Sequence, residues 1–216
     1  PGDAAPACRD ERECAVEETA SAAARGPPVQ GMLRLIALAF GWSLTCSVMI
    51  YALFASEFLG YAQPQLSATF SAGAAATVLT QIVVFPRLVR RVGEHAACSL
   101  GLAAVAVGLG GLGALRAPLA LHAGLYFLNR VGSGVGDTAT ATLVARCSAP
   151  DTKARNLGLI QSTRAAARIV TPTLSASLFD LSTRWRTAPG ALPFLVLASL
   201  CASLAPLPLW LKARGY

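Results

Sequence analysis

Ionisable side chains lie inside long apolar runs of this sequence. One such run contains the segment NRVGSGVGDTAT, residues 129–140, which carries Arg130 and Asp137. The two residues are seven positions apart, so on an α-helix they share one face, about 10 Å apart along the axis. An arginine and a carboxylate at bilayer depth can form an ion pair, bind a charged solute or relay a proton.

A later run places three polar side chains on one helical face. Gln161, Arg164 and Arg168 follow the spacing i, i+3, i+7. Asp137 and Arg164 both lie about nine residues from the ends of their runs, or about 13 Å in depth. We therefore predict that Asp137 pairs with Arg164 across two helices. The pair either fixes the packing of these helices or belongs to a solute path.

This pairing leaves Arg130 and Arg168 without a carboxylate. Unpaired cations imply an anionic or carboxylate-bearing solute, because an opposite charge offsets their desolvation. The residues that we expect to line the path are Arg130, Asp137, Arg164, Arg168, Gln161, Asn129 and Gln81. The candidates for carrying a coupling proton are Asp137 and Glu57, and the alternative for Glu57 is an exposed loop carboxylate.

Three glycines separate Arg130 from Asp137. Their pattern, G-x-G-x-G at residues 132–136, lacks both the spacing and the preceding strand of a phosphate-binding loop. Small residues in apolar helices allow a neighbouring helix to approach closely. We predict that these glycines serve packing.

The composition is that of a protein embedded in lipid. Of 216 residues, 54% are hydrophobic and 13% charged, whereas soluble domains carry about a quarter charged residues. Runs of roughly 20 apolar residues can each cross about 30 Å of hydrocarbon as a helix. We predict an all-α, polytopic membrane protein with a disordered cytoplasmic tail at 1–30 and a six-helix domain at 31–216. The predicted spans are 32–55, 66–86, 96–115, 119–145, 157–179 and 191–211. Trp42, Trp185 and Trp210 are interpreted as anchors at the membrane–water interfaces.

The basic residues predict the orientation. With the amino-terminal tail in the cytoplasm, twelve Lys and Arg residues in the tail, the loops and the span ends fall on that side and three on the other. Because cytoplasmic loops are enriched in these residues, both ends of the chain are expected in the cytoplasm. The net charge of +7 is thereby explained by topology, so no nucleic-acid partner is predicted.

The sequence lacks the signatures of several other classes of protein. Its six cysteines are scattered singly, so neither a disulfide framework nor a metal site is predicted, and no cofactor is implied. Neither Gly-x-Ser-Gly nor HExxH occurs, which argues against an intramembrane serine protease or a zinc protease. We expect no enzyme. Because the sequence begins at Pro1, we expect it to be a piece of a longer protein.

Two stretches resemble a known family. QIVVFPRLVRRVGEHAACSLGL (81–102) and ARNLGLIQSTRAAARIVTPTLSASLFD (154–180) resemble the carboxyl-terminal half of a major facilitator superfamily transporter, of the drug-antiporter or tetracycline-resistance type. The resemblance covers residues 32–211. It implies one half of the facilitator fold, whose third and sixth helices face lipid. The third and sixth predicted spans contain no charged residue and almost no strongly polar one, whereas the second, also uncharged, contains Gln81.

The resemblance also implies a function. The chain is expected to move a small organic solute, anionic or drug-like, by alternating access with proton coupling. A site between two six-helix halves requires either a missing amino-terminal half or a second copy of this chain. The alternative is a transport-inactive membrane scaffold, or a half-transporter that needs a partner half.

Overall fold

The computed structural model describes residues 27–115, 119–186 and 188–216. Most of the predicted tail at 1–30 therefore lies outside the described residues. Its last four residues instead belong to the first described helix, α2, which begins at Pro27. Within the described ranges the regular structure is helical throughout, which confirms the all-α prediction.

Each predicted span corresponds to one helix or to two or three helical segments joined end to end. The elements are α2 (Pro27–Phe58), α3 (Gln63–Leu79), η1 (Thr80–Val84), α4 (Phe85–Val92), α5 (Glu94–Ala114), α6 (Leu119–Arg146), α7 (Lys153–Thr183), α8 (Leu192–Leu204) and α9 (Leu207–Ala213). The second span consists of α3, η1 and α4, which together form one helix from Gln63 to Val92. The sixth span consists of α8 and α9.

The second span contains a π-helical turn, η1, that the sequence analysis did not predict. In this turn the Phe85 N–H donates to the carbonyl of Thr80, five residues earlier. Pro86 follows directly, and its ring has no N–H and crowds the carbonyl four residues before it. The wider turn relieves that crowding and lets the helix continue. After α4, Gly93 adopts a φ of 81°, a left-handed conformation that permits the sharp turn into α5.

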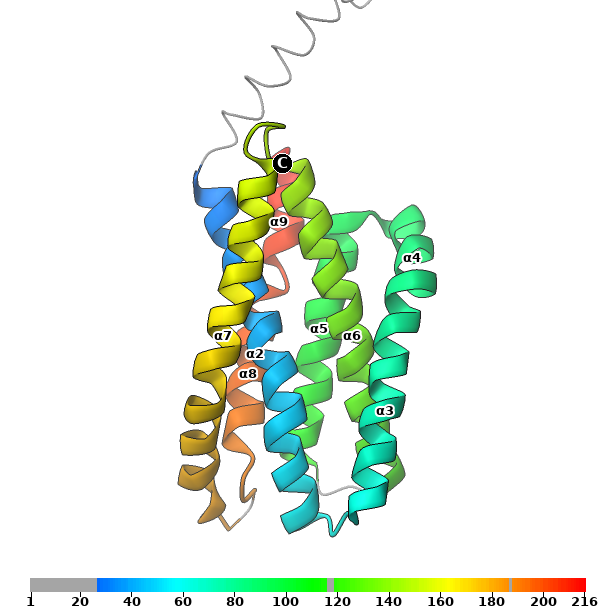
Figure 1. Cartoon of the computed structure of the whole chain (residues 1–216), viewed down its shortest axis with the longest axis vertical. Coiled ribbons are helices and arrows are strands. Elements are labelled where there is room, and N and C mark those ends of the chain that lie inside the picture. Colours follow the sequence, from blue (N-terminus) through cyan, green and yellow to red (C-terminus); the bar gives the residue numbers. More distant parts are fainter. Residues whose placement is uncertain (1–26, 116–118, 187) are drawn as a thin grey trace, which may run out of the picture.

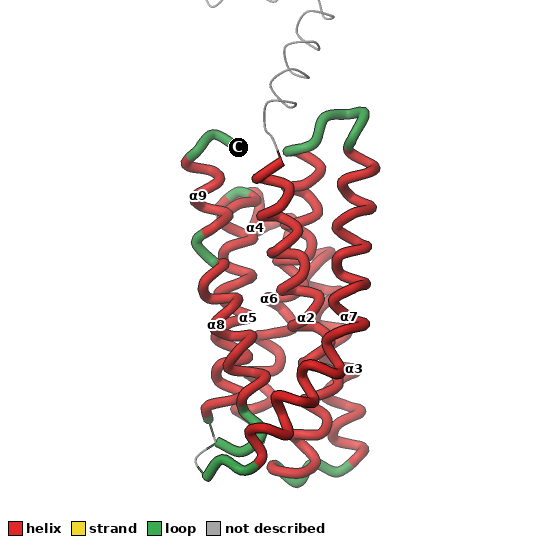
Figure 2. The backbone as a smooth tube through the Cα atoms, turned by 90° about the vertical axis from the view of Figure 1, so that its left-hand side faces the viewer, coloured by secondary structure: helices red, strands yellow, loops and turns green. Residues whose placement is uncertain are grey.

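The helices form three layers. Figures 1 and 2 show α2 and α6 in the middle layer, with α3 and α7 standing on one side of it and α5 and α8 on the other. α5 packs most extensively against α6 and then α8, and α2 packs against α7 and α6. The charged residues that lie deep in the bundle are therefore on α6, in the middle layer, and on α7, whereas α5 and α8 carry none along most of their length.

Among the described residues, four helices are long and apolar enough to cross a membrane by themselves: Val29–Phe58, Gln63–Val92, Glu94–Ala114 and Leu192–Ala213. The other two, α6 and α7, contain 28 and 31 residues and run alongside these four. At 1.5 Å per residue both exceed the roughly 30 Å of the hydrocarbon core. They are less apolar because they carry the charged residues in question.

Glycines bring α6 into close contact with its neighbours, as predicted. A Cβ atom added at Gly132 would lie 2.9 Å from the Gly101 carbonyl oxygen of α5. One added at Gly134 would lie 3.2 Å from the Thr77 carbonyl oxygen of α3, and one at Gly136 would overlap the Phe40 ring of α2. The three glycines thus admit three different helices to α6.

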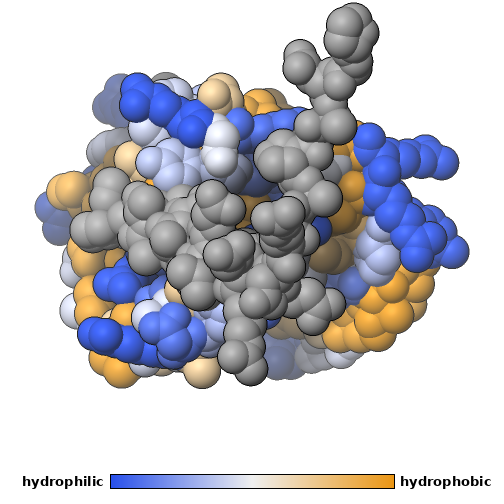
Figure 3. Space-filling model, turned by 90° about the horizontal axis from the view of Figure 1, so that it is seen from above, coloured by the Kyte–Doolittle hydropathy of each residue, from blue (hydrophilic) through white to orange (hydrophobic). Residues whose placement is uncertain are grey.

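Most of the basic residues lie at one end of the bundle. Figure 3 views this end, where hydrophilic side chains surround the centre and hydrophobic ones lie along the flanks. The exposed cations here are Arg87, Arg90, Arg91, Arg146, Lys153, Arg155, Lys212 and Arg214. The carboxyl terminus and the start of α2 lie at the same end (Figure 1).

Candidate functional site

Four polar residues form one continuous face of α6: Asn129, Arg130, Ser133 and Asp137. They follow one another within a 100° arc of the helix, and we call them the α6 polar face. The first three are buried, and Asp137 is half-buried. Side chains of this type are costly at bilayer depth, so each needs a partner or access to water.

Asp137 and Arg164 form the ion pair that their depths predict. The Arg164 Nη2 atom lies 3.0 Å from Asp137 Oδ1, and it also donates to the Asp137 backbone carbonyl at 3.1 Å. The carboxylate contact is too bent to be a hydrogen bond and is therefore electrostatic. The Arg164 side chain is 8% exposed, whereas Asp137 retains 27%. The carboxylate can thus be reached from outside the bundle, and the guanidinium cannot.

The first helix, α2, fixes the geometry of this pair. The Phe40 ring packs on Gly136, next to Asp137. A Cβ atom added at the neighbouring Gly41 would lie 3.3 Å from the Arg164 backbone and from Ala167. Because α2 packs closely on both partner helices, through the Phe40 ring on α6 and through Gly41 on α7, it sets the distance between Asp137 and Arg164.

Arg130 is buried between α6 and α3 rather than open to a cavity, which differs from the simplest sequence interpretation. It is 8% exposed. Its stem lies against Gly73 of α3, where an added Cβ atom would be 3.3 Å from Arg130 Cγ. Thr77 donates weakly to the Arg130 carbonyl, at 3.4 Å. The Nε and Nη1 atoms of Arg130 have no hydrogen-bond partner among the described residues.

The rest of the α6 polar face is also incompletely hydrogen-bonded. Ser43 of α2 donates to Asn129 Oδ1 at 3.3 Å. In the part of the chain that the structure describes, Asn129 Nδ2 and Ser133 Oγ find no partner. Buried polar atoms are normally satisfied, so a group of orphaned atoms on one face marks a place for water or a ligand.

The remaining predicted path residues lie on α7 and η1. Arg168 and Gln161 share a helical side with Arg164 but are exposed. Arg168 still lies within electrostatic reach of the Asp137 carboxylate, as does Arg130. Gln81 lies half-buried on η1, which packs against α6. Glu57 is exposed near the end of α2 that is remote from the basic end of the bundle.

Sequence reasoning missed a second ion pair. Arg146 Nη1, at the end of α6, lies 2.9 Å from Glu94 Oε2, at the start of α5. Glu94 is buried and Arg146 largely exposed. Because α5 and α6 are antiparallel, an acidic residue at the start of the first and a basic residue at the end of the second lie at the same end of the bundle. The positions of Glu94 and Arg146 in the sequence could therefore have predicted the pair.

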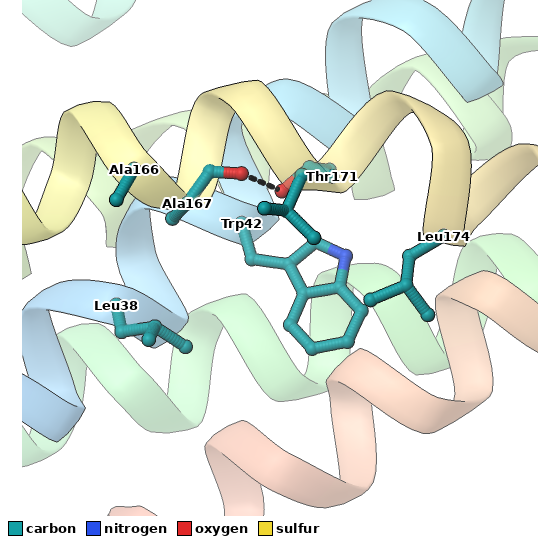
Figure 4. Close-up of a pocket in the computed structure, with 7 residues that line it drawn as sticks. Leu38, Trp42, Ala166, Ala167, Thr171 and Leu174 are labelled. Atoms are coloured by element: carbon teal, nitrogen blue, oxygen red, sulfur yellow. Dashed lines mark hydrogen bonds between the residues drawn. The ribbon is translucent and has the colours of Figure 1, made fainter.

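The predicted interfacial role of Trp42 is wrong, because its ring lies between helices near the middle of α2. There it lines an apolar pocket of about 260 Å³ between α2 and α7 (Figure 4). Trp42 Nε1 donates to Ser175 Oγ at 3.0 Å, and Thr171 donates to the Ala167 carbonyl at 2.6 Å. With its polar groups satisfied in this way, the pocket presents only apolar surface. The lining residues are Leu38, Trp42, Ala166, Ala167, Val170, Thr171 and Leu174.

Side chains suited to metal binding do not gather in the described ranges. No group of three or more His, Cys, Asp or Glu residues there is close enough to hold an ion. The chemistry that the arrangement offers is therefore that of guanidinium, carboxylate, amide and hydroxyl groups.

Comparison with known proteins gives one match. The sequence model of the Major Facilitator Superfamily matches residues 33–215, a range that runs from α2 to the end of α9. Neither a curated protein nor a solved structure matches the chain. Because the family model covers most of the chain and the helices form the expected bundle, this integral membrane protein belongs to the Major Facilitator Superfamily of membrane transporters.

Proposed function

We propose that the protein moves a small organic solute across the membrane by alternating access, along a path formed by α6 and α7. The observation that carries this proposal is the α6 polar face, with its orphaned buried atoms and its ion pair to α7. A charged residue at the bilayer centre costs about 2.5–3.5 kcal/mol on insertion scales. A helix whose role was only to pack against its neighbours would not need buried polar and charged side chains along one face.

The proposed path contains Asn129, Arg130, Asp137 and Arg164 in its buried part, and Arg168, Gln161 and Gln81 nearer its surface. The six described spans would form one half of the path. An amino-terminal six-helix half, or a second copy of this chain, would close it.

We assign the transport to proton-coupled efflux of the drug-antiporter type. Asp137 is the first candidate for the coupling proton, because its carboxylate is half-buried and holds Arg164 only while ionised. Protonation would weaken the link between α6 and α7, which is the kind of change that an alternating transporter needs. Glu57 is the second candidate, through its exposure to water.

The proposed orientation places both ends of the chain in the cytoplasm. The carboxyl terminus, the start of α2 and eight exposed cations lie at one end of the bundle. Positively charged loops are retained on the cytoplasmic side during insertion.

The rival proposal is a membrane scaffold or an inactive half-transporter. Uptake by the full-length protein in proteoliposomes distinguishes the two. Three radiolabelled solutes represent the classes: hippurate as an organic anion, tetraethylammonium as a cation and mannitol as a neutral solute. Each is tested with an acidic lumen and without a pH gradient.

We expect at least one solute to accumulate several-fold over protein-free vesicles when the lumen is acidic, and to lose that accumulation when the gradient is collapsed. An Asp137→Asn variant should lose the response to pH. If none of the three solutes is taken up above the level of protein-free vesicles, with or without the pH gradient, the scaffold account replaces the transporter account.

A further inference from the structure

Arg130 differs from Arg164, which is also buried, because the described residues offer its Nε and Nη1 atoms no acceptor. Arg164 is equally buried, and the fold supplies it with the Asp137 carboxylate and a backbone carbonyl. Arg130 receives neither at Nε or Nη1 from any residue that the structure describes. Burying a charged donor without a hydrogen-bond partner costs more free energy than burying an unpaired neutral group. A bound ligand that accepts hydrogen bonds from these donors would remove this cost.

Two other polar side chains on the α6 polar face also have a buried atom with no hydrogen bond among the described residues. Asn129 Nδ2 can only donate, and Ser133 Oγ can donate or accept. Both atoms are buried and have no partner within the described ranges. With the Arg130 guanidinium they form a cluster on one side of α6, whose unpartnered atoms are mainly hydrogen-bond donors. The complementary ligand is an oxyanion, and a planar carboxylate fits the two-pronged guanidinium.

The charge around the cluster favours a single negative charge on the ligand. Arg130 is its one guanidinium. Asp137 lies two helical turns away on the same face, about 10 Å along the axis, and acts electrostatically on Arg130. Its carboxylate would repel a dianion such as phosphate more strongly than a monoanion.

An aromatic wall continues from the cluster. Tyr126 lies one turn before Arg130 on α6, and a Cβ atom added at Gly73 would touch both residues. Phe70, on the same side of α3 as Gly73, is half-buried and lies 5.7 Å from the Tyr126 ring between centroids. A ligand whose carboxylate meets Arg130 would therefore place its body against apolar rings.

We propose that Arg130, with Asn129 and Ser133, is the seat of a small organic monocarboxylate whose apolar or aromatic body lies toward Phe70 and Tyr126. This inference rests on the proposed transport function and names the substrate class of that site. Because α3 covers Arg130 and is among the least buried helices of the bundle, the ligand would enter on the α3 side.

Thermal unfolding of the full-length protein in detergent tests the proposal without requiring transport. The probes are hippurate, its neutral analogue hippuramide, and inorganic phosphate. Hippurate at ten times its dissociation constant should raise the unfolding midpoint by about 3–6 °C. Hippuramide and phosphate should not raise it. The control variant, Arg184→Gln, removes an exposed arginine outside the site and should respond to hippurate as the original protein does.

Arg130→Gln should abolish the response to hippurate. Arg130→Lys keeps the charge but lacks the two-pronged guanidinium, so it should bind hippurate at least about tenfold more weakly. This variant also tests the proposal if the glutamine variant does not fold. Equal responses in the original protein and the Arg130 variants, a response to phosphate as large as to hippurate, or no response at all would overturn the proposal. Failure of the carboxylate site would not by itself refute transport. If the protein still took up another solute in response to the pH gradient, the proposed transporter function would stand.

Discussion

Two buried arginines, on α6 and α7, have opposite electrostatic surroundings. Arg164 contacts a carboxylate on the next helix, and Arg130 has unsatisfied donors against α3. The first arrangement resembles a structural link, because removing either partner leaves an uncompensated buried charge. The second is unfavourable unless a ligand or water completes it. The same helix, α6, therefore provides both a link to α7 and a place for a solute.

The Asp137–Arg164 link can be measured by a double-mutant cycle. Asp137→Asn and Arg164→Gln should each lower the free energy of unfolding by about 3–5 kcal/mol, since each leaves one buried charge alone. The double variant should lose less than the sum of the two, by about 1–3 kcal/mol. Denaturant unfolding in mixed micelles gives these values.

The Glu94–Arg146 pair is the matched control for this cycle. Its arginine side chain is 69% exposed, so the coupling free energy should stay below about 1 kcal/mol. Additive effects of the Asp137 and Arg164 substitutions would show that the contact between them contributes nothing, and the proposed link would have to be abandoned.

At the scale of elements, the glycines of α6 decide how closely its neighbours approach. Gly132 faces backbone atoms of α5, with the Gly101 oxygen and the Val105 nitrogen both 2.9 Å from a Cβ atom at that position. Backbone atoms in a packed helix pair cannot move aside individually, so a larger side chain must separate the helices.

Gly132→Leu should therefore destabilise the bundle by several kcal/mol, or prevent folding. Gly124→Leu is the control on the same helix, because a Cβ atom there meets nothing within 4 Å. Size-exclusion chromatography and thermal unfolding of the two variants provide the measurement. A Gly132→Leu protein as stable as Gly124→Leu would disprove the close contact between α5 and α6.

The elements also show what sequence reasoning can reach. The six spans follow from the length and apolarity of each run, which the bilayer imposes. The depth of Asp137 and Arg164 follows from counting residues inward, and this was enough to predict their pairing. Counting gives the level of a side chain along the helix axis, but not which neighbour it meets. The burial of Arg130 against Gly73 and the pocket around Trp42 depend on tertiary contacts. The π turn before Pro86 is a local response of the backbone to the proline, which the apolarity of the run does not report.

At the scale of the whole molecule, charge is sorted by layer. The layer of α5 and α8 carries no charged residue along most of its length, while α6 and α7 hold the ionised side chains that lie deep in the bundle. Lipid imposes this sorting, because a charge facing acyl chains is penalised and a charge facing water or a partner is not. In our account, the wet side of the bundle is the side along which the solute passes.

The most direct test of this account is the accessibility of single cysteines to a membrane-impermeant thiol reagent. Ser133→Cys and Gln161→Cys report on α6 and α7, in a background whose native cysteines are replaced by alanine. Val107→Cys on α5, which is 60% exposed in the bundle, serves as the lipid-facing control. The account predicts that positions 133 and 161 react from one side of the membrane, change side or rate when solute or a pH gradient is applied, and that position 107 stays unreactive. Positions 133 and 161 as unreactive as 107 under every condition would contradict it.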